Sequence, residues 1–522
     1  MIHASPYPDL DIPDSALTPF IFHHGARLDD KPAIIDVLNG RSLTYAEVLD
    51  GANRLAAGLA ERGFGKGQVL AILAPNVPEY PAAFHGVALT GGAITTLNPT
   101  YTAEEIAFQL KDSGARFLVT IPDLVDKARE AADASGVVED VLAIGGGPGV
   151  AAFDTLMSDG PVPEIAINPA EDVVALPYSS GTTGFSKGVM LTHRNLVANV
   201  LQIENGQHIS EDEGIIAFLP FFHIYGMQVL MNHALHKGAT ILSMPRFDLE
   251  PFLRTAQDHR VKRLFLVPPV VIALAKHPMV DQFDLSSVEI AFSGAAPLDA
   301  ETAETAARRV GCKVMQGYGL TETGPVTHLV PDTVDVVQPG SIGPSVPNTE
   351  VKVVDPDTGT ELGVGDDGEI WIRGPQVMKG YLNNDEATRG CIDDDGFFHS
   401  GDIGHVDEQG EFHIVDRLKE LIKVKGFQVA PAELEAVLIT HPSIADAAVI
   451  GIPDAESGEV PKAFVVFKEP MEEAAVKAYV AEKVAHYKQL RAVEVLDEIP
   501  KSASGKILRR LLRDREKATA AT

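Results

Sequence analysis

The sequence predicts a large α/β domain followed by a small α+β domain, because the hydrophobic pattern changes twice along the chain. Between residue 43 and about residue 330, short apolar strands alternate with amphipathic helices, as in Val69–Leu73 followed by Pro78–Leu89. Such alternation indicates α/β layers with largely parallel sheets. From about Thr349 onward, short strands with Gly and Asp turns dominate, and after Asp416 strands and helices are mixed again.

These two changes give the expected domain boundaries. Residues 1–416 would form the N-terminal domain, whose last part, about 340–416, would be a small β-rich subdomain. Residues 417–522 would form a compact C-terminal α+β domain of roughly one hundred residues. In that domain we expect one helix with Pro431 in its first turn, where proline fits best, and a second helix over Glu472–His486.

The composition and net charge of the chain restrict the classes of molecule that it can bind. The 522 residues are 45% hydrophobic and 22% charged, as in an ordinary globular protein. The formal net charge of −30 disfavours nucleic acid and anionic lipid, so a polyanionic ligand must meet a local cationic site. No apolar run could span a bilayer, no signal peptide is recognisable, and two cysteines, Cys312 and Cys391, fit a reducing compartment. We expect a cytoplasmic protein, and the sequence leaves a monomer and a homodimer equally open.

The first motif, YSSGTTGFSKG, runs from Tyr178 to Gly188. Its hydroxyls and glycines present N–H and O–H donors without bulk, which suits a phosphate chain, and Lys187 adds a mobile charge. It is not a Walker A motif, because Ser186 precedes the lysine and Gly188 follows it. A flexible turn is the alternative interpretation. The candidate phosphate contacts are Ser179, Ser180, Gly181, Thr182, Thr183 and Lys187.

The second motif is QGYGLTET, residues 316–323. Gly317 and Gly319 allow the backbone to approach a flat ring, on which Tyr318 could stack. Thr321 offers a hydroxyl to an α-phosphate, and Glu322 offers a carboxylate to Mg²⁺, which binds few protein oxygens. A strand-end turn with an unrelated acid is the alternative.

Polar residues nearer the C-terminus supply further candidates. Asp402, in an SGD turn, could accept two ribose hydroxyls, although aspartate is also common in turns. Lys506 follows a glycine in a loop before a basic segment, and a lysine on a mobile domain can be delivered to an active site and withdrawn; a surface lysine is the alternative. Four cations fall within nine residues and form either a solvated face or an anion site: Arg417, Lys419, Lys423 and Lys425.

Together these motifs resemble the signatures of the adenylate-forming superfamily, which includes acyl-CoA synthetases, peptide-synthetase adenylation domains and beetle luciferases. Five segments agree in order: YSSGTTGFSKG, QGYGLTET, SGD, DRLKELIKVKGFQV and PKSASGK. Within the superfamily, PFFHIYGM (220–227), KELIKVKGFQVAPAELEAVL and PKSASGKILRR are most similar to 4-coumarate–CoA ligases and their bacterial cinnamate-activating relatives. Ser186 departs from the proline usual in that group, from which we expect a looser loop with activity retained.

The resemblance implies an adenylate-forming fold and a role for each candidate. The catalytic residues would be Lys506, His223, Thr321 and Glu322, with Thr182 and Glu322 at Mg²⁺. ATP or AMP would contact the hydroxyl loop, Lys187, Gln316, Gly317, Tyr318, Thr321, Asp402, Arg417, Lys419, Lys423 and Lys506. Lys419 would also be the hinge of the small domain, and Arg246, Lys425 and Gly426 would contact CoA.

The same resemblance assigns an acyl pocket. His223, in an apolar run, would otherwise be interpreted as a core residue, but the matching histidine borders this pocket and moves to admit CoA. Small or apolar residues would line it and fit a flat aromatic or medium acyl chain: Tyr225, Gly294, Ala295, Ala296, Gly319, Pro325, Val326 and Leu329.

The sequence therefore predicts an ATP-dependent carboxylate–CoA ligase that forms an acyl-adenylate, uses Mg²⁺, and releases AMP and pyrophosphate. 4-Coumarate or a related aromatic acid leads by resemblance, and benzoates and medium-chain fatty acids remain open. An amino-acid-adenylating enzyme would need an aspartate near His223, which PFFHIYG lacks. A luciferase-like oxygenase shares every motif, and a non-enzymatic acyl-nucleotide sensor is disfavoured by the intact Lys187, Glu322 and Lys506.

Overall fold

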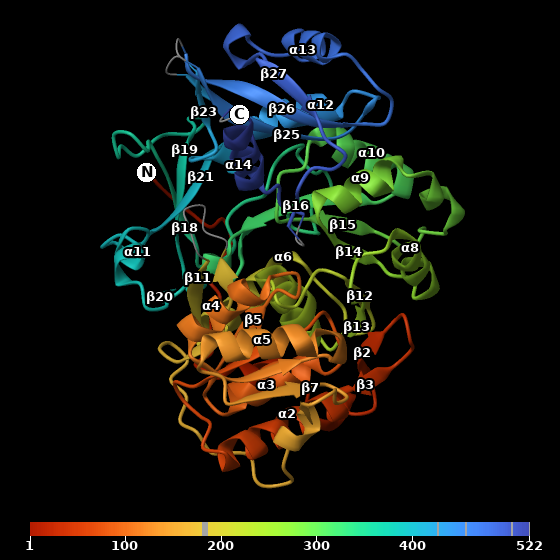
Figure 1. The fold of residues 1–522 in the computed structure, drawn as a ribbon, viewed down its shortest axis with the longest axis vertical. Helices are drawn as coiled ribbons and strands as arrows, with labels where there is room; N and C mark the ends of the chain where they lie inside the picture. Colours follow the sequence, from red (N-terminus) through yellow and green to blue (C-terminus); the bar gives the residue numbers. More distant parts are fainter. Residues whose placement is uncertain (180–185, 425–426, 455–456, 503–504, 521–522) are drawn as a thin grey trace.

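The structure, a computed structural model, describes residues 1–179, 186–424, 427–454, 457–502 and 505–520. Figure 1 shows three levels: a large sheet with its helices at the bottom, smaller sheets in the middle, and a separate sheet from the C-terminal part of the chain at the top. Within the described ranges, no helix is long and apolar enough to cross a membrane.

The lowest level is a nine-stranded sheet in the order β10-β11-β9-β5-β4-β6-β7-β8, with β20 paired to β11. The strands from β9 to β8 run parallel, and β10, β11 and β20 pair antiparallel. The strands are β4 (Val69–Leu73), β5 (Ala93–Leu97), β6 (Ala115–Thr120), β7 (Asp140–Ala143), β8 (Ala151–Ala152), β9 (Val173–Leu176), β10 (Tyr178–Ser179), β11 (Lys187–Thr192) and β20 (Gly380–Tyr381).

Helices cover both faces of this sheet, which explains why β4 is apolar at every position. Leu70 and Ile72 pack in one cluster with α2 (Tyr45–Glu61) and α3 (Tyr80–Leu89). Alternate residues of β4 pack in a second cluster with the helices on the other face, α4 (Ala103–Ser113) and α5 (Val125–Ser135).

Two four-stranded sheets make up most of the middle level, although β2 and β3 of the first lie as low as β7 in Figure 1. The first has the order β12-β13-β2-β3, and the second has the order β14-β15-β16-β17, in which β16 and β17 form an antiparallel hairpin. Their strands are β2 (Pro32–Asp36), β3 (Ser42–Thr44), β12 (Gly214–Ala217), β13 (Thr240–Ser243), β14 (Arg263–Leu266), β15 (Ile290–Ser293), β16 (Lys313–Gly319) and β17 (Val326–Leu329). The associated helices are α6 (His193–Gly206), the π-helix η4 (Gly226–His233), α7 (Ala234–His236), α8 (Leu249–Asp258), α9 (Pro268–Lys276) and α10 (Ala300–Val310).

An antiparallel sheet, ordered β1-β18-β19-β21-β22, lies beside them. Most of it comes from the part of the chain expected to be β-rich: β18 (Glu350–Val354), β19 (Gly368–Arg373), β21 (Phe398–Val406) and β22 (Phe412–Arg417). Its edge strand β1 (Ile2–Ala4) comes from the N-terminus and pairs with β18, a long-range contact that no local pattern in the sequence indicates. Short helices α1 (Leu17–Ile21) and α11 (Asp385–Arg389) complete the large part of the molecule.

The C-terminal part forms its own sheet, ordered β24-β23-β26-β25 with β27 paired to β26. Its elements are β23 (Ile422–Val424), β24 (Phe427–Val429), α12 (Pro431–Ile439), β25 (Ile444–Asp454), β26 (Gly458–Phe467), α13 (Glu473–Ala481), β27 (Ala492–Val495) and α14 (Arg509–Ala520). The helix expected to reach His486 ends at Ala481, because the chain turns there and packs Val484 and Tyr487 against the sheet core.

Candidate active site

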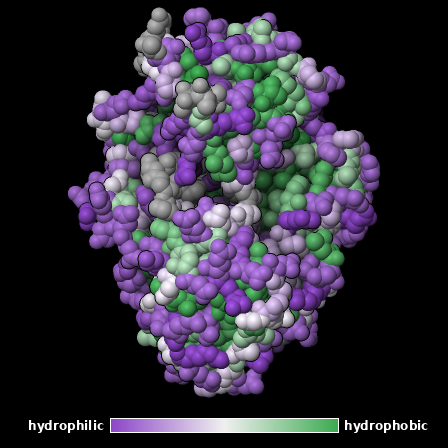
Figure 2. Space-filling view, in the orientation of Figure 1, coloured by the Kyte–Doolittle hydropathy of each residue, from purple (hydrophilic) through white to green (hydrophobic). Residues whose placement is uncertain are grey.

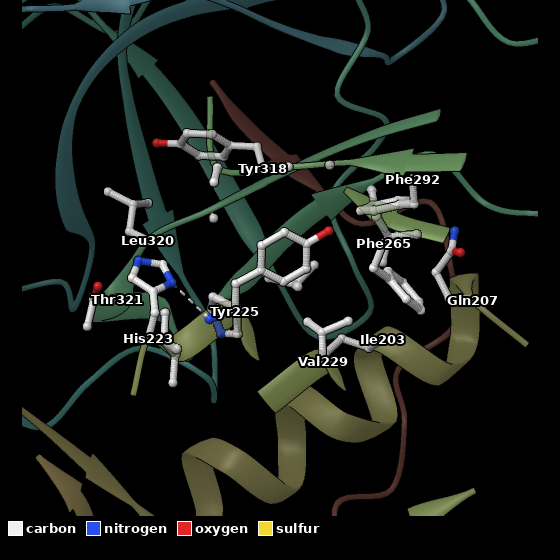
Figure 3. Close-up of a pocket in the computed structure, with 18 of the residues that line it drawn as sticks. Ile203, Gln207, His223, Tyr225, Val229, Phe265, Phe292, Tyr318, Leu320 and Thr321 are labelled. Atoms are coloured by element: carbon white, nitrogen blue, oxygen red, sulfur yellow. Dashed lines mark hydrogen bonds between the residues drawn. The ribbon is translucent and has the colours of Figure 1, made fainter. Parts of the chain in front are cut away.

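An elongated cavity lies between the sheets of the middle level and the C-terminal part of the chain. Figure 2 shows this face of the molecule hollowed near its centre, with apolar surface to the right of the hollow. The space enclosed between its lining residues is about 580 Å³, counting the part that is open to solvent. Figure 3 shows His223 and Thr321 at one end and Gln207 at the other, with Tyr225 between them.

Lys506 lines the cavity although it lies in the loop between β27 and α14. The preceding Gly505 has a φ of +80°, and a Cβ there would lie 3.3 Å from Cγ of Pro269 on α9, so glycine lets the loop approach the large part closely. Burial and the nearby Arg417 guanidinium lower the pKa of Lys506 to about 8, although Asp402 and Glu322 act in the opposite direction.

Asp402 lies opposite Arg417 in the β21–β22 pair, with 3.4 Å between its Oδ1 and Nε of the arginine. The hydroxyl of Tyr318, at the end of β16, donates to Oδ2 of Asp402 over 2.6 Å. Burial and the Asp402 charge raise the pKa of Tyr318 well above its usual value, so the phenol stays neutral. The structure thus brings together Tyr318, Asp402 and Arg417, three residues from separate sequence motifs.

Two glycines of the second motif are sterically required. A Cβ at Gly317 would lie 2.4 Å from Cζ of Phe292, and one at Gly319 would lie 2.0 Å from the Pro325 carbonyl oxygen. Gln316 is buried on the same strand, where its Oε1 accepts a hydrogen bond from the Leu298 amide. The close packing of β16 against β15 and of the β16–β17 connection on itself therefore explains the two glycines.

Glu322 and Lys187 meet at Tyr381, a residue of β20 that the motifs did not indicate. The Tyr381 hydroxyl donates to Oε1 of Glu322 over 2.9 Å, and Nζ of Lys187 lies 4.7 Å from the centre of the Tyr381 ring. The contact arises because β11 pairs with both β10 and β20. A local signal for it is lacking, since Tyr381 is far from both partners in the sequence.

The hydroxyl loop itself lies mostly outside the described residues. Ser180, Gly181, Thr182 and Thr183 belong to that gap, as do Lys425 and Gly426. Ser179 is described and lies opposite Lys187 in the β10–β11 pair. Ser186, the residue that replaces the usual proline, lies close enough to Tyr101 to lower the pKa of its phenol slightly against the larger effect of burial, which raises it.

Most residues predicted for the acyl pocket line this cavity. Tyr225, Gly294, Ala295, Gly319, Pro325, Val326 and Leu329 line it, whereas Ala296 is not among the lining residues that the structure describes. Nδ1 of His223 accepts a hydrogen bond from the Tyr225 amide over 3.3 Å. Burial and the charge of Lys506 lower the pKa of His223 to about 3, so its imidazole is neutral.

Several lining residues were missed by sequence reasoning. They lie on, or within two residues of, α6, η4, β14, β15 and β16: Ile203, Gln207, Ile224, Val229, Phe265, Phe292 and Leu320. Ile203 lies in the last turn of α6 and Gln207 follows the helix with an extended backbone, so an interval of four residues does not by itself place them on one helix face. Which side of that helix meets a cavity depends on its packing against β17, which sequence spacing does not reveal.

Three predicted residues are not among the described residues that line the cavity, although Lys419 lies within electrostatic reach of Arg417 and Asp402. Arg246 is exposed between β13 and α8, Lys419 is exposed after β22, and Lys423 is exposed on β23. The roles predicted for them concern CoA binding and a second orientation of the small domain, and these roles stay predictions.

Family models and a known relative match nearly the whole chain. The family described as "AMP-binding enzyme" matches residues 21–382, and "AMP-binding enzyme C-terminal domain" matches residues 433–506. The chain is 45% identical to 4-coumarate–CoA ligase 3 of Oryza sativa subsp. japonica, over 99% of this chain and 95% of the relative.

Solved structures have a similar fold. ATP-bound MatB from Rhodopseudomonas palustris has a TM-score of 0.87 at 32% identity, covering 97% of this chain and 99% of that one. An anthranilate CoA ligase in complex with anthranoyl-AMP has a TM-score of 0.89 at 26% identity, covering 98% and 99%. The expected fold is confirmed, and the chain belongs to the AMP-binding enzyme family.

Proposed function

We propose that the protein is an ATP-dependent carboxylate–CoA ligase that acts through an acyl-adenylate on 4-coumarate or a related aromatic acid. One observation carries the proposal: Lys506, from the C-terminal part, lies in an apolar cavity within electrostatic reach of Asp402, Glu322 and Arg417. The apolar walls of the cavity suit the hydrocarbon part of an acid, and the charged groups near Lys506 suit its carboxylate and a bound nucleotide. The relative named as a 4-coumarate–CoA ligase supports the acid class.

In the first step, a carboxylate oxygen of the acid attacks the α-phosphorus of ATP, and pyrophosphate leaves. Lys506 holds the carboxylate beside the α-phosphate and neutralises the charge that builds up there. Lys187 and the hydroxyl loop hold the β- and γ-phosphates, and Thr321 donates to the α-phosphate. Tyr318, Asp402 and Arg417 bind the adenosine.

In the second step, the CoA thiol attacks the acyl carbon, loses its proton, and AMP leaves. The C-terminal part rotates about Lys419, which withdraws Lys506 and brings Lys423, Lys425 and Gly426 to the site. His223 is neutral and can turn without moving a charge. Arg246, exposed on the surface of the large part, is then available to a phosphate of CoA.

The residues around Glu322 fit a divalent cation. Its carboxylate is buried, and its Oε1 is held by Tyr381, whereas Oε2 accepts no hydrogen bond from the residues that the structure describes. Glu322 would hold Mg²⁺, with Thr182 beside it, and the ion would supply positive charge to the phosphates. Tyr381 fixes the direction of the carboxylate.

The cavity walls favour an aromatic acid over an amino acid. Tyr225, Phe265 and Phe292 contribute flat apolar surface. Among the described lining residues, none is an aspartate or glutamate that could pair with a substrate ammonium group. A panel assay of AMP release with 4-coumarate, cinnamate, benzoate, octanoate and phenylalanine tests this, and we expect the cinnamates to react fastest. Preference for octanoate or phenylalanine would contradict the acid class.

The role of Lys506 is tested by separating the half-reactions. We expect Lys506→Ala to lower ATP–pyrophosphate exchange by about 10²–10³-fold, the usual effect of losing a charge-stabilising donor, and to spare thioester formation from preformed acyl-AMP. Lys501→Ala is a matched control, because Lys501 precedes the same loop and pairs with Asp446 at 2.6 Å. Equal loss of both half-reactions in Lys506→Ala would rule out the rotation.

A further inference from the structure

We propose that Gln207 determines specificity by binding a hydroxyl at the end of the acid opposite its carboxylate. This inference rests on the proposed function, since it concerns the acid in the same cavity. Gln207 follows the last residue of α6 and lies at the end of the cavity far from His223 and Thr321 (Figure 3). Its side chain is almost fully buried, with the residue 1% exposed.

The surroundings of Gln207 fix which way its amide points. Nη1 of Arg263 donates to Oε1 over 2.6 Å, and Nε2 donates to the Val330 carbonyl oxygen over 3.0 Å. A guanidinium can only donate and a carbonyl can only accept, so the reversed amide would face two mismatched partners. The orientation of the amide therefore follows from the chemistry of its neighbours.

Arg263 is itself held in place. Its Nη2 donates to Oδ2 of Asp332 over 2.9 Å, and both side chains are less than one-tenth exposed. Oδ1 of Asp332 is 2.7 Å from Nδ1 of His208, the residue after Gln207. A buried charge pair held in this way is a rigid support for a polar group at a pocket wall.

The amide keeps hydrogen-bonding capacity for a ligand. The bond to Val330 uses one of the two N–H groups and the bond from Arg263 uses one of the two lone pairs of Oε1, and the described residues supply no partner for the others. The nearby cavity wall is apolar: Ile203, Val229, Phe265, Phe292 and Leu329. A ligand hydroxyl can accept from the remaining N–H and donate to the remaining lone pair, whereas a methyl group leaves both unpaired in a dry site.

The difference between these two ligands is the quantity to measure. A hydroxyl and a methyl group are close in size, so 4-hydroxycinnamate and 4-methylcinnamate fill the cavity alike and differ in hydrogen bonding. Sites built to bind a substrate hydroxyl discriminate strongly against analogues that lack it. We expect wild-type kcat/KM to favour the hydroxy acid by about tenfold or more.

The test compares this ratio in wild type, Gln207→Leu and Ile203→Val. Gln207→Leu should remove the preference or reverse it, mainly by lowering kcat/KM for the hydroxy acid. Ile203→Val changes the same wall one helical turn earlier without touching a polar group, so it should affect both acids equally. A wild-type ratio near one, or an unchanged ratio in Gln207→Leu, would overturn the proposal.

Binding measurements keep this inference separate from the proposed function. Calorimetry with the sulfamoyl-adenosine analogues of the two acids gives the same ratio without turnover. A protein that binds both analogues but makes no thioester contradicts the proposed function, while the binding ratio still decides on Gln207. If Gln207→Leu fails to fold, the wild-type ratio alone decides.

Discussion

The Lys506 ammonium group must carry a positive charge in surroundings that lower its pKa. It must be charged to neutralise the α-phosphate, yet burial and Arg417 already lower its pKa to about 8. A lysine in this range is charged at neutral pH and loses its proton only slightly above it. The group is therefore sensitive to pH where most lysines are not.

This sensitivity predicts a pH profile. The charged form exists below the pKa, so kcat/KM for ATP in pyrophosphate exchange should fall as the pH rises through about 8, by tenfold per unit beyond it. Lys506→Arg stays charged and should give a lower but flat profile between about pH 6.5 and about pH 9.5. Parallel profiles for the two proteins would show that another group titrates.

At the scale of elements, α14 is tied to the rest of the C-terminal part by a buried ion pair. Nη2 of Arg509 donates to both carboxylate oxygens of Glu435 on α12, over 2.8 and 2.7 Å, and both side chains are mostly buried. Burial raises the pKa of Glu435, although Arg509 opposes this. The Val449 amide also donates to Oε1 of Glu435 over 2.7 Å, and Arg509 supplies the positive charge that balances the buried carboxylate.

Removing that partner should destabilise the C-terminal part. We expect Arg509→Ala to lower the free energy of unfolding of the C-terminal part by about 3–5 kcal/mol, because an uncompensated charge stays buried.

Arg510→Ala is the matched control. The Arg510 side chain comes next along α14, is 68% exposed, and has its Nε 3.7 Å from Oδ2 of Asp514. Its loss should change the free energy of unfolding by less than about 0.5 kcal/mol. Denaturant titration measures both, and equal effects would contradict the assignment.

The elements also explain what the sequence could and could not predict. Strand–helix alternation depends on local burial, so β4, α3 and the β-rich sheet were predictable in type. Pairing of β1 with β18, and of β20 with β11, joins distant segments and has no local pattern. Tyr381 and Gln207 reach the site only through such packing, whereas Lys506 and Glu322 were predictable because their motifs resemble a family.

At the scale of the whole molecule, polar contacts between the described residues of the two parts hold the C-terminal part in the orientation that inserts Lys506. One is the hydrogen bond from Nζ of Lys276, on α9, to the Ile439 carbonyl oxygen at the end of α12, over 3.3 Å. A cation at a helix C-terminus also interacts favourably with the helix dipole. The contact belongs to the orientation proposed for adenylation.

Weakening this contact should affect one half-reaction. We expect Lys276→Met to slow pyrophosphate exchange by about fivefold, the effect of one hydrogen bond, and to leave thioester formation from acyl-AMP unchanged. Lys262→Met, which removes an exposed lysine before β14, should change neither rate. Slower thioester formation in Lys276→Met would place the contact in the other orientation.

The β16–β17 hairpin has a consequence for how such enzymes diversify. It carries Tyr318 toward the nucleotide residues and Leu329 toward the acid, whereas Ile203, Gln207 and Phe265 reach the far wall from α6 and β14. Substitutions on α6 and β14 can therefore create new acid preferences while the ATP machinery is inherited intact. A combinatorial library confined to these three positions is a compact starting point for directed evolution of the acid pocket.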